Sequence, residues 1–94
     1  MTDRLTVYRR DYCGYCRMLE RALHGAGVDY DRRDIYDDPQ AAAFVGSVNN
    51  GDETVPTVVL PNGEVRTNPR PRDVLHQLGI EPPLWRDRVG LGGH

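Results

Sequence analysis

Both cysteines of the chain, Cys13 and Cys16, are separated by two residues in the stretch RRDYCGYCRMLERAL. Such a pair can act in redox chemistry, contribute to a metal site, or pack as two small buried side chains. A tetrahedral zinc site needs four ligands, and the three histidines of the chain do not have ligand spacing relative to the cysteines. The spacing and the helical pattern beside the cysteines favour a redox pair, and we expect no metal ligands.

The predicted helix begins at Gly14, so the two cysteines belong to its first turn. Residues three apart lie on one side of a helix, which lets the two sulfurs approach bonding distance. Cys13 would lie among the unpaired N–H groups and the positive end of the helix dipole, which favour a thiolate. Cys16 would point toward the core. We therefore predict that Cys13 attacks and Cys16 resolves. Arg10 either adds positive charge to this site or is a solvated surface residue.

The second informative stretch is Thr54-Val55-Pro56, directly before a predicted strand. Proline is tolerated at the start of a strand because its missing N–H is not needed there. If the Val55–Pro56 bond is cis, the chain turns sharply and the Val55 backbone is free to bind an extended, thiol-bearing substrate. Tyr15 offers an aromatic flank for a ligand beside the sulfur, while Tyr12 either lines the site or packs the loop.

Periodicity along the chain predicts the element order β-α-β-α-β-β-α. The expected elements are a strand over Leu5–Tyr8, a helix from Gly14 that stops at Gly25 and Gly27, a strand within Val28–Ile35, a helix over Ala41–Val45 after an Asp38-Pro39 start, a hairpin of Thr57–Leu60 and Glu64–Thr67, and a helix from Pro71 to Gly79. The first three elements form a β-α-β unit, which implies parallel strands and a right-handed crossover. The pattern predicts an α/β domain with one sheet.

The first predicted helix has an apolar face and a polar face. The apolar face is predicted to contain Met18, Leu19, Ala22, Leu23 and Ala26. The charged and polar residues are predicted to face elsewhere, namely Arg17, Glu20, Arg21 and His24. The helix should therefore bury its apolar side on the sheet.

The 94 residues allow one compact domain, which we assign to residues 1–79, with residues 80–94 as a tail of unknown role. Trp85, in that tail, either folds back on the core or contacts a partner. The net charge of -2 argues against a non-specific nucleic-acid binder. The sequence has neither the apolar run of roughly 18 residues that a membrane span needs nor an apolar N-terminal signal, so we expect a cytoplasmic protein.

The chain resembles the thioredoxin superfamily, and within it the glutaredoxin branch, from about Leu5 to Gly79. The resemblance rests on C-G-Y-C at 13–16, T-V-P at 54–56 and the element order. The sequence is more closely similar to the mycoredoxins, which are actinobacterial glutaredoxin-like proteins. That similarity includes AAAFVGSVNNGDETVPTV at 41–58 and TNP at 67–69.

The resemblance implies a thioredoxin fold with a central four-stranded mixed sheet flanked by helices. It also implies an enzyme that reduces mixed disulfides between proteins and mycothiol, the thiol that these bacteria use in place of glutathione. Cys13 would attack the mycothiol sulfur, and a second mycothiol would release it as a disulfide that an NADPH-dependent mycothiol disulfide reductase recycles. The implied partners are mycothiol and mycothiolated proteins. We expect a monomer with no tightly bound cofactor and with mycothiol as co-substrate.

The region 67–73, TNPRPRD, departs from the glutathione-dependent glutaredoxins, which carry a Gly-Gly pair and an aspartate there. Asn68 and Asp73 could hydrogen-bond a sugar-containing thiol instead, although Asp73 also suits a helix N-terminus. Two alternatives remain. A ribonucleotide reductase electron donor recharged by thioredoxin reductase would usually carry a W-S-G-F-R-P stretch, which this sequence lacks. A dimer bridged by an iron–sulfur cluster is compatible with Gly14 after the first cysteine.

Overall fold

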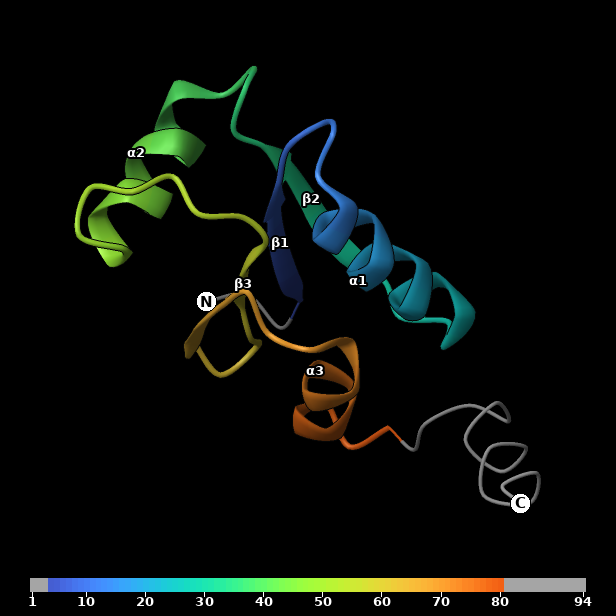
Figure 1. Cartoon of the computed structure of the whole chain (residues 1–94). Coiled ribbons are helices and arrows are strands. Elements are labelled where there is room, and N and C mark those ends of the chain that lie inside the picture. The colour runs from blue at the N-terminus through green and yellow to red at the C-terminus, as the bar shows by residue number, and fades with distance from the viewer. Residues whose placement is uncertain (1–3, 81–94) are drawn as a thin grey trace.

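The computed structural model describes residues 4–80 and has the element order that the sequence predicts (Figure 1). The elements are β1 (Leu5–Arg9), α1 (Gly14–Gly25), β2 (Tyr30–Asp34), α2 (Pro39–Val48), β3 (Thr57–Val59), β4 (Val65–Thr67) and α3 (Pro71–Gln77). Trp85 and the rest of the predicted tail after Ile80 lie outside the described residues. Within residues 4–80, no helix is long and apolar enough to span a membrane.

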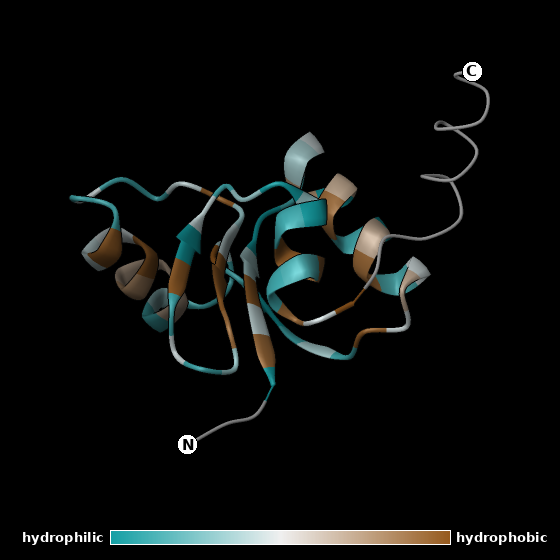
Figure 2. Ribbon diagram, turned by 90° about the horizontal axis from the view of Figure 1, so that it is seen from below, coloured by the Kyte–Doolittle hydropathy of each residue, from teal (hydrophilic) through white to brown (hydrophobic). Residues whose placement is uncertain are grey.

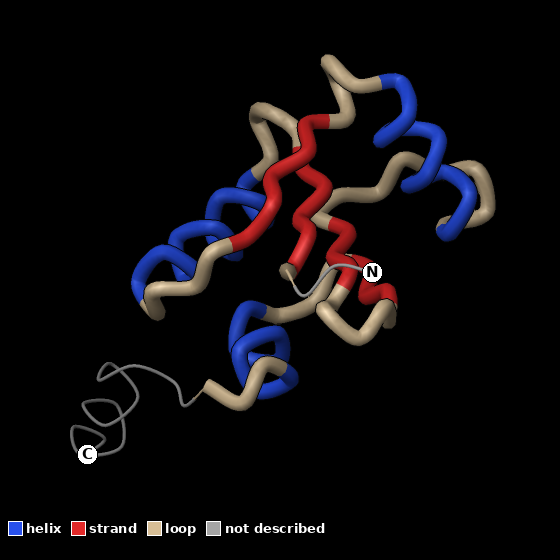
Figure 3. The backbone as a smooth tube through the Cα atoms, turned by 180° about the vertical axis from the view of Figure 1, so that it is seen from behind, coloured by secondary structure: helices blue, strands red, loops and turns tan. Residues whose placement is uncertain are grey.

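The four strands form one mixed sheet in the order β2-β1-β3-β4. Strand β1 pairs in parallel with β2, with Leu5 opposite Tyr30, and α1 provides the connection between them. Strand β3 runs antiparallel to both β1 and β4, so β3 and β4 form the predicted hairpin. The tube in Figure 3 shows the strands side by side with the helices around them. The predicted mixed four-stranded sheet is confirmed.

Helices cover both faces of this sheet, with α1 and α3 on one face and α2 on the other (Figure 2). The larger core cluster joins β1, α1, β3 and α3 and consists of Leu5, Val7, Leu19, Leu23, Val58, Leu60, Val74 and Leu75. A smaller cluster lies under α2, where Tyr8 and Phe44 pack against Ile35, Ala41 and Val45. Alternate residues of a strand point to opposite faces, which explains why Val7 and Tyr8 belong to different clusters.

The start of α2 matches the sequence prediction closely. Asp38 is the N-cap, and its Oδ1 accepts hydrogen bonds from the N–H groups of Gln40 and Ala41, both at 3.1 Å. Pro39 occupies the first helical position, where a missing N–H costs nothing. The helix continues to Val48, past the predicted end at Val45.

Three predictions about β1 and α1 are wrong. Arg9 was expected in a loop but forms the last residue of β1, where it pairs with Asp34 of β2. Met18 was expected on the buried face of α1 but is 52% exposed. Glu20 was expected in solvent but is only 8% exposed, because three polar groups surround its carboxylate. The buried side of α1 is therefore turned toward β2 relative to the apolar pattern.

Candidate active site

The loop after β1 brings Cys13 to the beginning of α1 as its N-cap residue. Its backbone is extended, with φ of -114° and ψ of 107°, and its side chain is half-buried. The Cys16 N–H donates a hydrogen bond to the Cys13 Sγ at 3.1 Å. A sulfur that caps a helix in this way replaces the hydroxyl or carboxylate oxygen of an ordinary N-cap. A donor aimed at the sulfur stabilises negative charge there.

Cys16 lies in the opposite environment. Its side chain is fully buried, at 0% exposure, in the first turn of α1. Burial, together with the hydrogen bond to Cys13, raises the pKa of the Cys16 thiol to about 12. The structure thus has one accessible sulfur that receives an N–H and one enclosed sulfur that holds its proton. Both cysteines are free thiols.

The loop before β3 lies against Cys13. The Val55–Pro56 peptide bond is cis. The carbonyl oxygen of Val55 lies 3.8 Å from the Cys13 Sγ, within reach of a thiol donor. Among residues 4–80, the Val55 N–H has no hydrogen-bond partner, so this backbone donor is available to an extended ligand beside the sulfur. Thr54 fixes the loop through its carbonyl, which accepts a hydrogen bond from the Thr57 hydroxyl at 2.7 Å.

Asn68 joins the same region from the other end of the hairpin. Its N–H donates to the Pro56 carbonyl at 2.7 Å, and its side chain is exposed. The residue adopts a left-handed conformation, with φ of 48°, which asparagine tolerates better than most residues. The structure therefore places Asn68 beside the cis-proline loop, which in turn contacts Cys13.

Three further predicted site residues surround Cys13 without touching it through any described hydrogen bond. Tyr12 is 99% exposed and has a φ of 62°, so the alternative that it packs the loop is wrong. Tyr15, in the first turn of α1, is 64% exposed. Arg10 is exposed and donates to the Glu53 carbonyl at 3.5 Å, which links the loop before α1 to the loop before Thr54. Two accessible aromatic rings and one guanidinium thus lie within three residues of Cys13 along the chain.

Comparison with known proteins decides the family. The family model described as Glutaredoxin matches residues 5–66, which contain both cysteines and the cis-proline loop. The chain belongs to the glutaredoxin family. A protein of Mycobacterium tuberculosis that bears a glutaredoxin name is 45% identical over 83% of this chain and 93% of its own length. Mycoredoxin 1 of Corynebacterium glutamicum is 39% identical over 79% of this chain and 91% of its own.

A solved structure supports the fold independently. The crystal structure of a thioredoxin-like protein superimposes with a TM-score of 0.66 at 27% identity and covers 80% of this chain and 99% of the other. The predicted thioredoxin-like fold is therefore confirmed. Membership of the glutaredoxin family makes the protein a thiol–disulfide oxidoreductase. Its C-x-x-C pair is at the start of α1, with Cys13 as the N-cap residue and Cys16 in the first turn.

Two polar groups that support this glutaredoxin site were not predicted from the sequence. The first is Asn49, the C-cap residue of α2. Its Nδ2 donates to the Val45 carbonyl at 2.9 Å and to the Thr57 hydroxyl at 3.3 Å, and its Oδ1 accepts from the Thr67 hydroxyl at 2.7 Å. Asn49 thereby ties the end of α2 to β3 and β4, the strands that carry the cis-proline loop and Asn68.

The second is a charged cluster beneath the first turns of α1. Glu20 accepts from Arg9 Nε at 3.0 Å, from Arg32 Nε at 2.7 Å and from the Tyr30 hydroxyl at 2.7 Å. Arg9, itself only 6% exposed, also donates to Asp34 at 2.6 Å. The cluster fixes α1 to both β1 and β2. Glu20 lies four residues after Cys16, on the same side of the helix, but nothing in the sequence marks the two arginines of the strands as its partners.

The cluster shifts the pKa of its members in the directions expected of a satisfied ionic group. Burial alone would raise the pKa of Glu20, but the hydrogen bonds from Tyr30, Arg32 and Arg9 outweigh it and lower that pKa. Burial, followed by the hydrogen bond to Glu20, raises the pKa of Tyr30 to about 12. Within residues 4–80, no group of three or more cysteine, histidine or acidic side chains is arranged to hold a metal ion.

Proposed function

We propose that this glutaredoxin-family protein reduces mixed disulfides between proteins and mycothiol, with mycothiol as its co-substrate. The observation that carries the proposal is the half-buried Cys13 Sγ, which receives the Cys16 N–H at 3.1 Å and lies against the cis-proline loop. The choice of thiol is supported by the similarity to Mycoredoxin 1 and by TNPRPRD at 67–73, which replaces the Gly-Gly pair of glutathione-dependent relatives.

The reaction is thiol–disulfide exchange in two steps. The Cys13 thiolate attacks the mycothiol sulfur of the mixed disulfide, the old S–S bond breaks, and the target protein leaves as a thiolate that takes up a proton. The thiolate of a second mycothiol then attacks the mycothiol sulfur bound to Cys13. The bond between Cys13 and mycothiol breaks, and the S–S bond of mycothiol disulfide forms. Cys13 leaves with the electron pair of the broken bond, which regenerates its thiolate.

Cys16 is not needed for that route. Its buried thiol can instead lose its proton and attack the Cys13 Sγ of the mixed intermediate, which releases mycothiol and leaves a Cys13–Cys16 disulfide. Because its pKa is raised to about 12, we expect this diversion to be slower than attack by free mycothiol at neutral pH.

The residues around Cys13 have matching roles in this proposal. An extended ligand would accept a hydrogen bond from the free N–H of Val55. Thr54 and Pro56 hold that backbone in place. Asn68 would hydrogen-bond the sugar part of mycothiol, and Tyr15 would flank its thiol-bearing arm. We propose that the protein acts as a monomer in the reducing cytoplasm, without a tightly bound cofactor, and that mycothiol disulfide reductase recycles the oxidised thiol.

The test compares mycothiol with glutathione as the reductant of a peptide mixed disulfide, in the parent and in Cys13→Ser and Cys16→Ser variants. We expect turnover with mycothiol to be lost in Cys13→Ser and retained in Cys16→Ser. Glutathione turnover equal to or faster than mycothiol turnover in the parent would refute the assignment of the thiol. Faster turnover with thioredoxin reductase and no mycothiol would also refute it.

A further inference from the structure

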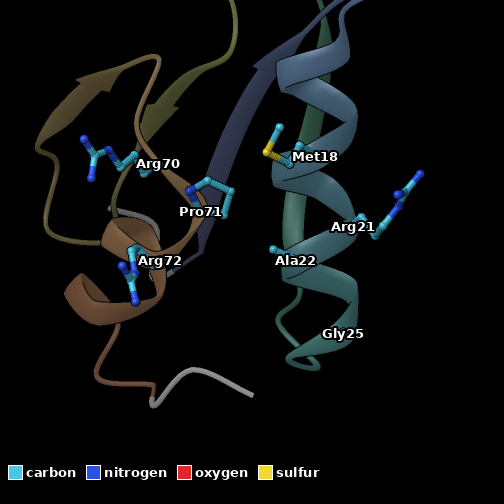
Figure 4. A pocket seen from close by; sticks show the side chains of 7 residues that line it. All are labelled: Met18, Arg21, Ala22, Gly25, Arg70, Pro71 and Arg72. Carbon is cyan, nitrogen blue, oxygen red and sulfur yellow. The ribbon is translucent and has the colours of Figure 1, made fainter. Parts of the chain in front are cut away.

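A groove between α1 and α3 is lined by neither of the cysteines. Its volume is about 710 Å³. In Figure 4, Met18 and Ala22 on α1 and Pro71 on α3 face the space between the two helices. Gly25 continues the α1 wall to the end of the helix, and its missing side chain leaves that end open. The floor of the groove is therefore apolar.

Three arginines surround the mouth of this groove: Arg21, Arg70 and Arg72. All three are exposed, and among residues 4–80 none of their guanidinium groups has a hydrogen bond or an ion pair. By contrast, the guanidinium groups of Arg9, Arg32 and Arg33 are each paired with carboxylates. The groove thus combines an apolar floor with uncompensated positive charge.

The carboxylate of Asp73 forms no ion pair with the arginines of this rim among residues 4–80. Asp73 lies in the first turn of α3 but lines a different and smaller pocket, together with Thr67 and Val74. None of the described residues that line the groove is acidic. Its charge therefore complements a partner that supplies its own carboxylates.

Both walls of the groove are close in sequence to residues of the active site. On α1, the exposed side chains of Tyr15 and Met18 follow Cys13 at intervals of two and five residues. On the α3 side, Arg70 follows Asn68, whose N–H is bonded to the Pro56 carbonyl. A protein joined to Cys13 through a disulfide would therefore have neighbouring residues within reach of the groove.

We propose that this groove docks a segment of the protein partner that combines an aliphatic side chain with aspartate or glutamate. The proposal rests on the proposed function, because it concerns the protein half of the mixed disulfide. With a rise of ~1.5 Å per helical residue and ~3.4 Å per extended residue, the groove between Met18 and Gly25 is reached about two to five residues from the partner's cysteine. The acidic segment should therefore lie within this distance of the partner's cysteine along its chain.

The test uses peptides that carry one cysteine in a mixed disulfide with mycothiol. The acidic peptide has a leucine and two aspartates three to five residues after the cysteine, and the matched peptide has asparagines in place of the aspartates. For the parent we expect kcat/KM to favour the acidic peptide about fivefold at low salt, which is the range of one strong exposed ion pair. The preference should disappear in high salt because exposed charges are screened.

The decisive variant is the double substitution Arg70→Gln, Arg72→Gln, which should remove the preference and leave the rate on the neutral peptide unchanged. Arg17→Gln is the matched control. It removes one positive charge, where the double variant removes two, from an exposed arginine of α1 that does not line the groove, so it should retain the preference. A peptide with serine in place of leucine should react more slowly with the parent.

A second peptide set capped with glutathione separates this proposal from the choice of thiol. Faster turnover of that set with glutathione would refute the mycothiol assignment, yet a preference for the acidic peptide in either set would support the groove. Equal rates on acidic and neutral peptides in both sets would overturn the docking proposal. The groove would then be covered by something else, such as residues 81–94 or a second copy of the chain.

Discussion

The two flanks of helix α1 have opposite characters. The flank toward β1 and β2 buries Cys16 and Glu20, and the arginines that reach it are held by carboxylates. The flank toward α3 exposes Tyr15 and Met18, and the arginine on its outer edge, Arg21, has no partner among residues 4–80. We call the flank toward β1 and β2 the fixed flank and the flank toward α3 the open flank. Cys13 is the N-cap residue of this helix.

The difference shows how a short domain can hold a reactive sulfur still while leaving its surroundings accessible. Buried ionic groups are costly unless every partner is present, so the cluster around Glu20 defines a single position for α1 against the sheet. Exposed apolar side chains and unpaired charges contribute little to that position. They are therefore the part of α1 that is suited to contact with other molecules.

The largest difference between the two sides should appear in the reactivity of the cysteines. Burial raises the pKa of the Cys16 thiol to about 12, so its thiolate fraction at neutral pH is far below that of an ordinary cysteine. Cys16 is also fully buried, whereas Cys13 is accessible. We expect iodoacetamide at pH 8 to label Cys13 at least ~100-fold faster than Cys16.

Peptide mapping by mass spectrometry after brief labelling measures both rates in one sample. Labelling in urea is the control, because unfolding should bring the two rates close together. Similar rates in the folded protein would show that the first turn of α1 opens readily, and the contrast between the two flanks would not hold for its cysteines.

The next largest effect should come from breaking the charged cluster on the fixed flank. Glu20→Gln removes the charge that faces Arg9 and Arg32. Losing one partner of a buried ion pair typically costs ~3–5 kcal/mol, and we expect ~2–3 kcal/mol here because Arg9 keeps Asp34. Urea denaturation at pH 7 measures this loss in the free energy of unfolding.

Glu64→Gln is the matched control for that substitution. Glu64 pairs with Arg66 at 2.9 Å, but both side chains are largely exposed, at 50% and 40%. Such a pair should contribute less than ~1 kcal/mol. If the two substitutions had equal effects, the cluster around Glu20 would be no more important than a surface ion pair.

The same cluster predicts a pH dependence with a definite sign. The pKa of Glu20 is lowered in the folded protein from its usual 4.5, so folding favours the ionised carboxylate. Its contribution to stability is fully present above pH 4.5 and is lost as the pH falls through the lowered pKa. Below pH 4.5, the free energy of unfolding of the parent should therefore approach that of Glu20→Gln. Parallel urea titrations at pH 7, 5, 4 and 3 test this; a constant gap between the two proteins would contradict it.

The open flank and the cysteines were accessible to sequence reasoning, whereas the fixed flank was not. The spacing of Cys13 and Cys16 at the start of a predicted helix indicates a redox pair. Asp38-Pro39 combines an N-cap residue with a proline suited to the first helical position. These are local signals that depend on a few neighbouring residues. The alternation of Leu5 and Val7 similarly predicts a strand with one face in the core.

Glu20 and Met18 could not be placed because their burial depends on distant residues. A hydrophobicity pattern assigns methionine to the core and glutamate to solvent. Here Arg9 and Arg32 come from two strands and pair with the glutamate beneath the helix, which rotates Met18 outward. Pairing between residues 11 or 12 positions apart leaves no periodic trace in the sequence.

The smallest predicted effect concerns the end of α1, where Gly25 and Gly27 lie two residues apart but differ in conformation. A Cβ at either position would meet no atom within 4 Å, so packing does not distinguish them. Gly25 lies within the helix and lines the open groove, whereas Gly27 has a φ of 71°. We expect Gly25→Ala to raise the free energy of unfolding by ~0.5–1 kcal/mol, since alanine favours helix over glycine.

Gly27→Ala should instead lower it by ~1–2 kcal/mol, because a Cβ is unfavourable in the left-handed region. Urea denaturation of both variants beside the parent measures the two changes, and each substitution serves as the control for the other. Opposite signs would mean that backbone conformation alone decides the effect at these open positions. If Gly25→Ala destabilised the protein, the groove wall at the end of α1 would be a packed surface, and the open flank would be shorter than the structure indicates.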